Sequence, residues 1–435
     1  LMNEATVSLG SDAAASVVAP ASRTQGRRAV IAAAIGNGLE IYDFTVYSFF
    51  AATIGRLFFP ASSPLASLLL SFATFGAGFV MRPLGAVLIG NMADRRGRKA
   101  ALTLTIGLMT AGTALLAFTP SYASIGVTAT ALVVVGRLLQ GLSAGGEVGA
   151  ASALLMESTG KQRRCFAVSW QGASQGAAAL LGALTGAAVS ALLSPEALQS
   201  WGWRVPFMLG LLIAPVGIYI RRHLEETQTE NTAHAGLMTV VREHRRTLIL
   251  GVLLMTSSTS SMYIMVFYMP TYLVNTVHMP PVTAFLGACV AGLTMLVMSP
   301  LFGLLADRLP RRKPLLIANS VVAISVMVPN FALLSSGPGL PLTLACIALS
   351  VTLSSVGGGA GSALMMESLP RHHRATGMSI MYSVGVTVFG GFAPLVVTWL
   401  IATTGSRMAP VGYMLCASLI SFTALLLFPS HPGRD

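Results

Sequence analysis

The sequence predicts an all-α integral membrane protein with twelve transmembrane helices in two pseudo-symmetric six-helix bundles. Composition, the division into long apolar segments, and two repeated motifs lead to this prediction. The chain has 435 residues, of which 54% are hydrophobic and 10% are charged, whereas about a quarter of the residues in soluble domains are charged. So few charged residues cannot cover a soluble protein of this length, and we therefore expect lipid around the helices.

Charge clusters and Pro/Gly turns divide the chain into twelve segments long enough to cross a membrane, since a spanning helix needs about 20 mostly apolar residues. The expected spans lie near 29–53, 65–90, 100–118, 125–155, 163–192, 203–221, 247–273, 282–306, 314–335, 340–367, 374–400 and 409–428.

The basic residues predict the orientation, because cytoplasmic loops are enriched in Lys and Arg. Of the 27 Lys and Arg residues, 22 fall in the N-terminal tail, in the loops that follow the second, fourth, sixth, eighth and tenth spans, and in the C-terminus. Both termini are therefore expected in the cytoplasm. The same asymmetry accounts for the net charge of +12, so nucleic acid is not an expected partner. The four cysteines stand singly in apolar stretches, which argues against disulfides or a zinc site.

The longest polar run separates six spans from six. We expect a cytosolic tail at 1–28, bundles at 29–221 and 247–428, a cytosolic linker at 222–246 and a second tail at 429–435. GNMADRRGRKA at 90–100 returns as GLLADRLPRRKP at 303–314, and ALLMES at 153–158 returns as ALMMES at 363–368. Two similar bundles are what alternating access about a central site requires.

GNMADRRGRK resembles the loop signature of the major facilitator superfamily (MFS), and GRLLQGLSAG at 136–145 resembles that superfamily's fourth-helix motif. GNGLEIYDF at 36–44, RPLGAVLIG at 82–90, SAGGEVGAASALLMES at 143–158 and SWQGASQ at 169–175 together resemble its metabolite:proton symporter family, most closely the citrate and tricarballylate carriers. The resemblance implies the MFS fold, proton-coupled uptake of small organic acids or zwitterions, and a bacterial inner membrane.

Ionisable residues at membrane depth cost about 2.5 to 3.5 kcal/mol each near a helix centre, so few are kept without a use. Every histidine falls in a loop or at a span end, and the coupling proton is therefore expected on a carboxylate. Asp43 and Glu40 are the first candidates and Glu147 is the third. For Glu147, a structural salt bridge is the alternative to carrying the proton.

Buried polar and aromatic residues supply candidates for the substrate site. Arg137 is the leading candidate for an anionic group, while Arg82 equally suits a structural pair with an acid. Gln171 and Gln175 suit either substrate contact or interhelical hydrogen bonding, and the full set of candidates is Arg137, Arg82, Asn37, Tyr47, Gln140, Gln171, Gln175, Tyr268 and Tyr382. The second half has no charge at the centre of a span, and its TSSTSS run at 256–261, its tyrosines and its GGG run at 357–359 can form neutral pocket walls.

The resemblance implies that the duplicated motifs act as a gate that holds the cytosolic side closed. Its expected members are Asp94, Arg95, Gly97, Arg98, Glu157, Asp307, Arg308 and Glu367. Carboxylate and guanidinium groups at helix ends can cap helix dipoles and pair across bundles.

The leading functional hypothesis is a proton-driven importer of a small di- or tricarboxylate such as citrate or tricarballylate. Symport of a zwitterion such as betaine or proline, or of an aromatic carboxylate, is the alternative, and antiport comes third. The six-plus-six repeat argues against a receptor or channel, and no Walker loop, HExxH motif or nucleophile–base set indicates an enzyme. We expect no cofactor and no metal, and a monomer in the lipid bilayer.

Overall fold

Long apolar helices make up almost all of this computed structural model, which describes residues 37–429 apart from residues 39, 97, 146, 158 and 223–236. The described residues contain no strand, and nine of their helices are long and apolar enough to cross a membrane. The expectation of an all-α membrane protein is confirmed.

The helices fall where the spans were expected, the first of which is described only from residue 37. Residues 40–49 are helical. After them come α2 (Ala51–Phe58), α3 (Pro64–Arg96), α4 (Arg98–Phe118), α5 (Tyr122–Ile125), α6 (Val127–Ala144), α7 (Glu147–Glu157), α8 (Arg164–Leu192), α9 (Pro195–Ser200), α10 (Val205–Arg222), α11 (Leu237–Met262), η3 (Tyr263–Tyr268), α12 (Met269–Asn275), α13 (Pro281–Arg308), α14 (Arg312–Ser335), α15 (Leu340–Glu367), η4 (Arg371–His373), α16 (Arg374–Val386), η5 (Thr387–Gly391), α17 (Ala393–Thr404) and α18 (Ala409–Leu427).

Several spans are interrupted, for reasons that are visible in the backbone. The span expected at 125–155 is divided between α6, which ends at Ala144, and α7, which begins at Glu147. At its start, Gly126 has φ of +63° and separates the short α5 from α6. Two spans of the second half contain wide turns of π-helix, η3 and η5. Such turns often occur at functional sites. The seventh span begins earlier than expected, at Leu237, and α11 is kinked at His244.

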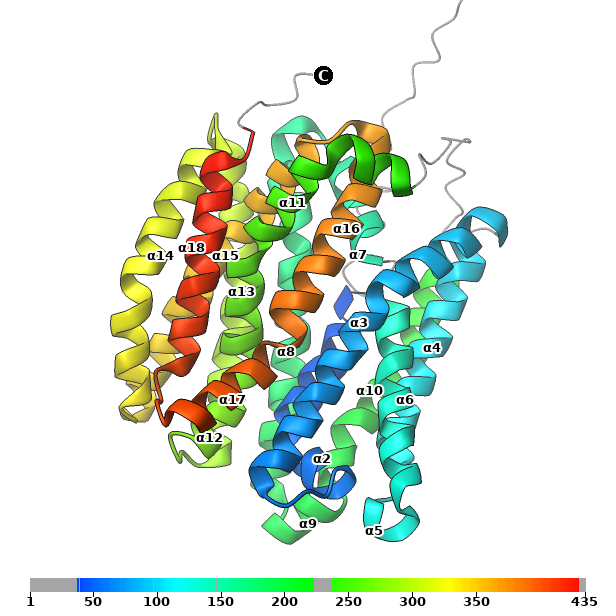
Figure 1. The fold of residues 1–435 in the computed structure, drawn as a ribbon, viewed down its shortest axis with the longest axis vertical. Helices are drawn as coiled ribbons and strands as arrows, with labels where there is room; N and C mark the ends of the chain where they lie inside the picture. The colour runs from blue at the N-terminus through cyan, green and yellow to red at the C-terminus, as the bar shows by residue number, and fades with distance from the viewer. Residues whose placement is uncertain are drawn as a thin grey trace, which may run out of the picture.

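Figure 1 separates the two halves of the chain: α3, α4 and α6 lie on one side, and α14, α15 and α18 lie on the other. Helices α8 and α13 meet between them, where Gly176 and Gly292 let the backbones approach; a Cβ on Gly176 would lie 2.7 Å from the carbonyl oxygen of Gly292. Small residues are the usual means of close helix packing in membranes.

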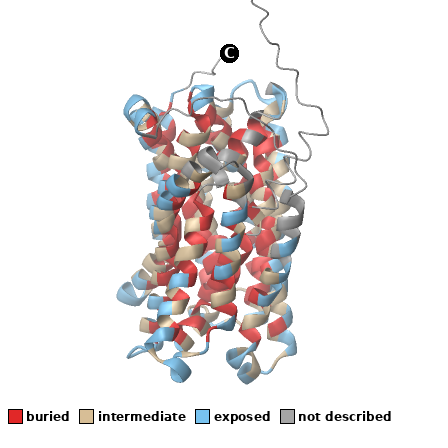
Figure 2. Cartoon of the chain, turned by 90° about the vertical axis from the view of Figure 1, so that its right-hand side faces the viewer, coloured by how far each residue is buried: buried red, intermediate tan, exposed pale blue. Residues whose placement is uncertain are grey.

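Apolar side chains also cover much of the outside of the molecule. Figure 2 shows buried residues along the interior and exposed residues on the outer faces and at the ends. The exposed side chains include Leu184, Leu301 and Leu426, each about half accessible. An exterior of this kind fits hydrocarbon and not water.

One end of the bundle collects basic residues, and we call it the basic end. It comprises Lys161–Arg164, the turn from Arg308 to Lys313, and η4, and it lies at the top of Figure 1. The opposite end carries α5, α9 and α12.

Candidate functional site

A buried ion pair joins the first helix to α3. Arg82 Nη2 lies 2.6 Å from Glu40 Oε1, and the two side chains are only 1% and 4% exposed. Pro83 lies inside α3 directly after Arg82. A pair with this little access to water is stable only when both charges stay together, because removing one partner leaves a buried, uncompensated charge.

Asp43, one helical turn after Glu40, has a separate set of partners from α4 and α6. Its Oδ2 accepts a short hydrogen bond from the Thr113 hydroxyl and a longer one of 3.3 Å from Gln140 Nε2. Gln140 also donates to Thr113 over 3.0 Å, and its Oε1 accepts from Arg137 Nη1 over 2.6 Å. Gln140 therefore stands between the buried acid and the buried base.

Arg137 is enclosed by aromatic rings. Its guanidinium carbon lies 4.5 Å from the ring centre of Phe44, 4.2 Å from that of Tyr47 and 5.1 Å from that of Phe75. Cation–π contacts of this kind stabilise a desolvated guanidinium. The side chain is fully buried, and its Nε and Nη2 have no hydrogen-bond partner among the described residues.

A cavity of about 220 Å³ lies mostly within the second half of the chain. α8 contributes Gln171 and Gln175, and α11 contributes Ser257, Ser258, Thr259 and Ser261. The Gly357–Gly359 run also lines it, and a Cβ on Gly357 or Gly358 would meet nothing within 4 Å. The glycines therefore widen the cavity.

Three of the predicted substrate residues line this cavity: Gln171, Gln175 and Tyr382. Tyr382 also lies close to the Arg82 guanidinium, whose Nε and Nη1 have no hydrogen-bond partner in the described part of the chain. Tyr382 therefore connects Arg82 to the cavity wall. Both arginines face aromatic rings, since the Arg82 guanidinium carbon lies 5.2 Å from the ring centre of Phe44 and 4.4 Å from that of Phe79.

The remaining predicted substrate residues do not line the cavity, and each has a structural partner. Asn37 Nδ2 donates to Gln171 O over 3.1 Å and to Ser174 Oγ over 2.9 Å, which ties the first helix to α8. The Tyr47 hydroxyl donates to Ser71 O over 3.1 Å. The Tyr268 hydroxyl accepts from Thr398 over 3.1 Å.

Sequence reasoning missed several polar residues. Thr113 was not singled out, and Asn319 and Asn330 of α14 line the cavity without having been predicted. Both asparagines bind α15, since Asn319 donates to Leu353 O over 3.1 Å and Asn330 to Cys346 O over 3.0 Å. An asparagine in an apolar span is the signal that could have found them.

At the basic end, Asp307 of α13 joins the two halves of the chain. Its two carboxylate oxygens accept from the backbone N–H groups of Cys165 and Phe166, over 2.9 and 2.8 Å. These groups open α8, so Asp307 supplies a cap to a helix of the other half and complements the positive end of its dipole.

Glu367 makes a second connection at this end. It lies 3.2 Å from Arg164 of α8 and is also paired with Arg312 of α14. We call Asp307, Glu367 and Arg164 the latch. Arg308, the third predicted gate residue here, is exposed.

The other predicted gate and proton residues cannot be placed. Gly97 and the side chains of Asp94, Arg95, Arg98, Glu147 and Glu157 lie outside the described part of the structure.

Comparison with known proteins adds the family to this geometry. The sequence matches the family model of the Major Facilitator Superfamily over residues 30–296 and 285–435. It is 36% identical to the citrate-proton symporter of Klebsiella pneumoniae over 401 residues, which cover 91% of this chain and 90% of that protein. It is 32% identical to the glycine betaine/proline/ectoine/pipecolic acid transporter OusA of Dickeya dadantii, with 91% and 81% covered.

Among solved structures, the chain resembles the D-xylose-proton symporter with a TM-score of 0.75 at 17% identity, covering 93% of this chain and 98% of that one. At this identity the likeness concerns the fold alone.

Proposed function

Because this chain belongs to the Major Facilitator Superfamily, we propose that it imports a small organic di- or tricarboxylate together with protons, by alternating access. The observation that carries the proposal is the buried arrangement of Asp43, Gln140 and Arg137 beside the Glu40–Arg82 pair. The citrate-proton symporters at 35–36% identity support the substrate class.

Asp43 is the coupling group in this proposal. A buried carboxylate is stable as an anion only while its cation and hydrogen-bond donors stay in place, and it takes a proton when they move away or when water leaves. Thr113 and Gln140 come from two other helices, α4 and α6, so a small shift of either helix changes the environment of Asp43. Glu40 is held by Arg82 and is the second carrier.

Arg82 is the better placed of the two arginines to bind a substrate carboxylate. Each arginine has two nitrogen atoms without a hydrogen-bond partner among the described residues, but Arg82 also interacts with Tyr382, which lines the cavity. A carboxylate that enters past Tyr382 can therefore bind Arg82 through charge-assisted hydrogen bonds. Such an anion also competes with Glu40 for the same guanidinium, and this competition links substrate binding to the protonation of Glu40.

The latch controls which end is open. We assign the basic end to the cytosol from the distribution of Lys and Arg. Asp307 and Glu367 belong to the second half and bind groups of α8 in the first half, so rocking the bundles apart at this end breaks both contacts. Substrate enters from the other end while the latch is closed.

A zwitterion is the second candidate substrate. No charged residue is found among the described residues that line the cavity, which instead offers hydroxyls, amides, methionines and the rings of Tyr263 and Tyr382. Aromatic faces suit a quaternary ammonium group. The relatives that carry betaine and proline, at 30–32% identity, agree with this alternative.

Transport in liposomes tests the proposal. Purified protein is reconstituted with citrate, tricarballylate, phthalate, glycine betaine or proline inside, and labelled counterflow is measured with and without an inward proton gradient. We expect counterflow for a tricarboxylate and uphill uptake only with the gradient. Counterflow of betaine or proline alone would select the second candidate, and uptake that ignores the gradient would contradict proton coupling.

A further inference from the structure

Two histidines from different helices, α11 and η4, meet at the basic end. His244 lies at the kink of α11, and His373 ends η4, directly before α16. Their ring nitrogens, Nε2 of His244 and Nδ1 of His373, are 3.0 Å apart. His373 is 3% exposed and His244 is half-buried, so the contact lies at the edge of the protein interior.

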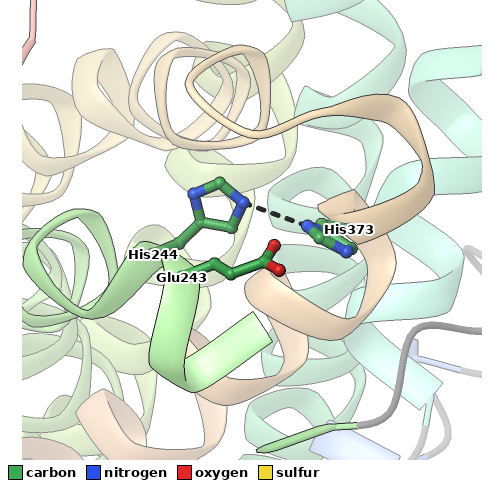
Figure 3. A group of neighbouring side chains, drawn as sticks. All are labelled: Glu243, His244 and His373. Carbon is green, nitrogen blue, oxygen red and sulfur yellow. Dashed lines mark hydrogen bonds between the residues drawn. The ribbon is translucent and has the colours of Figure 1, made fainter. Parts of the chain in front are cut away.

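A carboxylate completes the group. One oxygen of Glu243, one nitrogen of His244 and one nitrogen of His373 all lie within 4.8 Å of one another. Figure 3 shows the Glu243 carboxylate beside the hydrogen-bonded pair of rings. The three residues therefore present two imidazoles and one carboxylate to a common point. We call them the His–His–Glu group.

From this juxtaposition we propose that the His–His–Glu group binds a divalent transition-metal ion of the Zn²⁺ or Ni²⁺ class, in a site separate from the transport pathway. Imidazole and carboxylate are the ligands that such ions take in proteins, and a catalytic-type zinc site has three protein ligands and one open position. Two nitrogens bound to one tetrahedral zinc stand about 3.3 Å apart, given Zn–N bonds of about 2.0–2.1 Å. The observed 3.0 Å is close to that separation.

The two neutral imidazoles can bind a metal ion without losing or gaining a proton. In the hydrogen-bonded pair, one of the two facing nitrogens carries a proton and the other accepts it. When that imidazole changes tautomer, its proton moves to the ring nitrogen that faces away, and both facing nitrogens become free to bind a metal. Neither histidine changes its charge, and no other reactant is needed.

The kink of α11 serves this site. The non-helical backbone at His244 has φ of −118° and ψ of 23°, and it turns the start of α11 so that Glu243 and His244 both reach η4. A metal bound there would join the start of α11 to the segment that begins α16. We therefore expect the ion to stabilise the basic end of the second half.

Metal binding to tag-free, EDTA-treated protein tests the proposal. Zn²⁺, Ni²⁺ and Mg²⁺ are titrated in a non-chelating buffer, with calorimetry and thermal unfolding as readouts. We expect one site for Zn²⁺ and Ni²⁺, a raised melting temperature with either ion, and no effect of Mg²⁺, because Mg²⁺ prefers oxygen ligands.

Variants locate the site. His244→Gln and His373→Gln should each weaken Zn²⁺ binding at least tenfold, and Glu243→Gln should weaken it less. The control is His278→Asn, at an exposed histidine with φ of +66° in the loop before α13, a backbone conformation that asparagine tolerates. It should bind Zn²⁺ as the wild type does.

If burial makes His373→Gln unstable, His244→Gln and Glu243→Gln still show whether Zn²⁺ binds at this group. Unchanged Zn²⁺ affinity in His244→Gln, or no metal-dependent stabilisation of the wild type, would overturn the proposal and leave a hydrogen-bonded histidine pair only.

Discussion

Glu40 and Asp43 lie one helical turn apart, yet they have different partners and so suit different tasks. Glu40 is paired directly with Arg82 over 2.6 Å. Asp43 reaches Arg137 only through Gln140 and receives a hydroxyl from Thr113. A direct ion pair in a dry interior resists protonation more strongly than a carboxylate held by neutral donors. This difference supports the proposal that Asp43 carries the coupling proton.

Asp43→Asn should abolish uphill accumulation and leave counterflow at least partly active, because the amide keeps the shape and the hydrogen bonds of the site but cannot titrate. Substrate accumulation under an imposed proton gradient and counterflow without a gradient are compared in the same liposomes. Gradient-driven accumulation at the wild-type level in this variant would remove Asp43 from the coupling role.

The two buried arginines can be told apart by lysine substitutions, which keep the charge but lose the planar fork that binds a carboxylate twice. Arg82→Lys should weaken substrate binding at least tenfold, or about 1.4 kcal/mol. Arg137→Lys should leave substrate affinity near the wild-type value and change the pH dependence of transport, since Arg137 acts on Asp43 through Gln140. Affinity is measured by calorimetry, and transport is measured across a range of pH. The reverse pattern would place the substrate anion on Arg137.

The buried ions of the first half were predictable from the sequence because charge in an apolar span is conspicuous. Their partners were less predictable: the sequence indicated that Arg82 and Arg137 lie near the acids but not which acid each arginine interacts with. Thr113 could not have been chosen among the other threonines of α4, since a hydroxyl in a helix usually bonds to its own backbone. Thr113 does this as well, to Met109 O over 3.0 Å.

At the scale of helices, glycines set the position of the charged residues. Helix α6 carries Arg137 and Gln140, and Gly141 follows directly. A Cβ on Gly141 would lie 1.7 Å from the carbonyl oxygen of Gly78 on α3, and one on Gly145 would lie 1.9 Å from that of Arg82. Only glycine lets α6 pack this closely on α3. The positions of Arg137 and Arg82 therefore depend on it.

Gly141→Ala should destabilise the protein by about 1–3 kcal/mol, the usual cost of overpacking, and should also impair transport by moving Arg137 away from Asp43. Gly107→Ala is the matched control, because a Cβ there meets nothing within 4 Å and alanine favours a helix by up to about 1 kcal/mol over glycine. Thermal unfolding in detergent compares the two. Equal melting temperatures would show that α3 and α6 can separate without cost.

Span positions followed from apolar length, but the breaks within spans did not. The π-helical turn η3 includes Tyr263 and Tyr268, and nothing in YIMVFY distinguishes it from an ordinary apolar helix. The second such turn, η5, contains Gly390 and Gly391, which the sequence marked only as a place that could bend. The π-turns are favoured by packing between helices, as where Thr387 donates to Phe79 O over 2.9 Å, and such contacts are not local in sequence.

At the scale of the whole molecule, the proposed latch would keep the basic end closed. Two carboxylates of the second half hold the start of α8: Asp307 caps its backbone, and Glu367 binds Arg164. Arg312 also pairs with Glu367, but both belong to the second half, so that contact need not break when the halves separate. In the proposed gating, the contacts of Asp307 and Arg164 between the halves are the ones expected to favour the closed state.

Cys165 is a natural reporter of this equilibrium. Its backbone N–H donates to Asp307, and the residue has no exposed surface in this structure.

Glu367→Gln removes the ion pair with Arg164, in which the Arg164 and Glu367 side chains are 12% and 17% exposed. An exposed pair is worth up to about 1 kcal/mol, and breaking a pair that is largely shielded from water costs more, so the loss shifts a two-state equilibrium at least about fivefold toward the open state. In protein with Cys289, Cys346 and Cys416 replaced by alanine, Glu367→Gln should therefore raise the rate of maleimide labelling at Cys165 at least about fivefold, as followed by mass spectrometry. Arg311→Gln is the control, because it removes an exposed charge from the same turn and should leave the rate unchanged. If labelling of Cys165 is equally slow in both variants, the Arg164–Glu367 pair does not hold this end closed, and Asp307→Asn becomes the variant to examine.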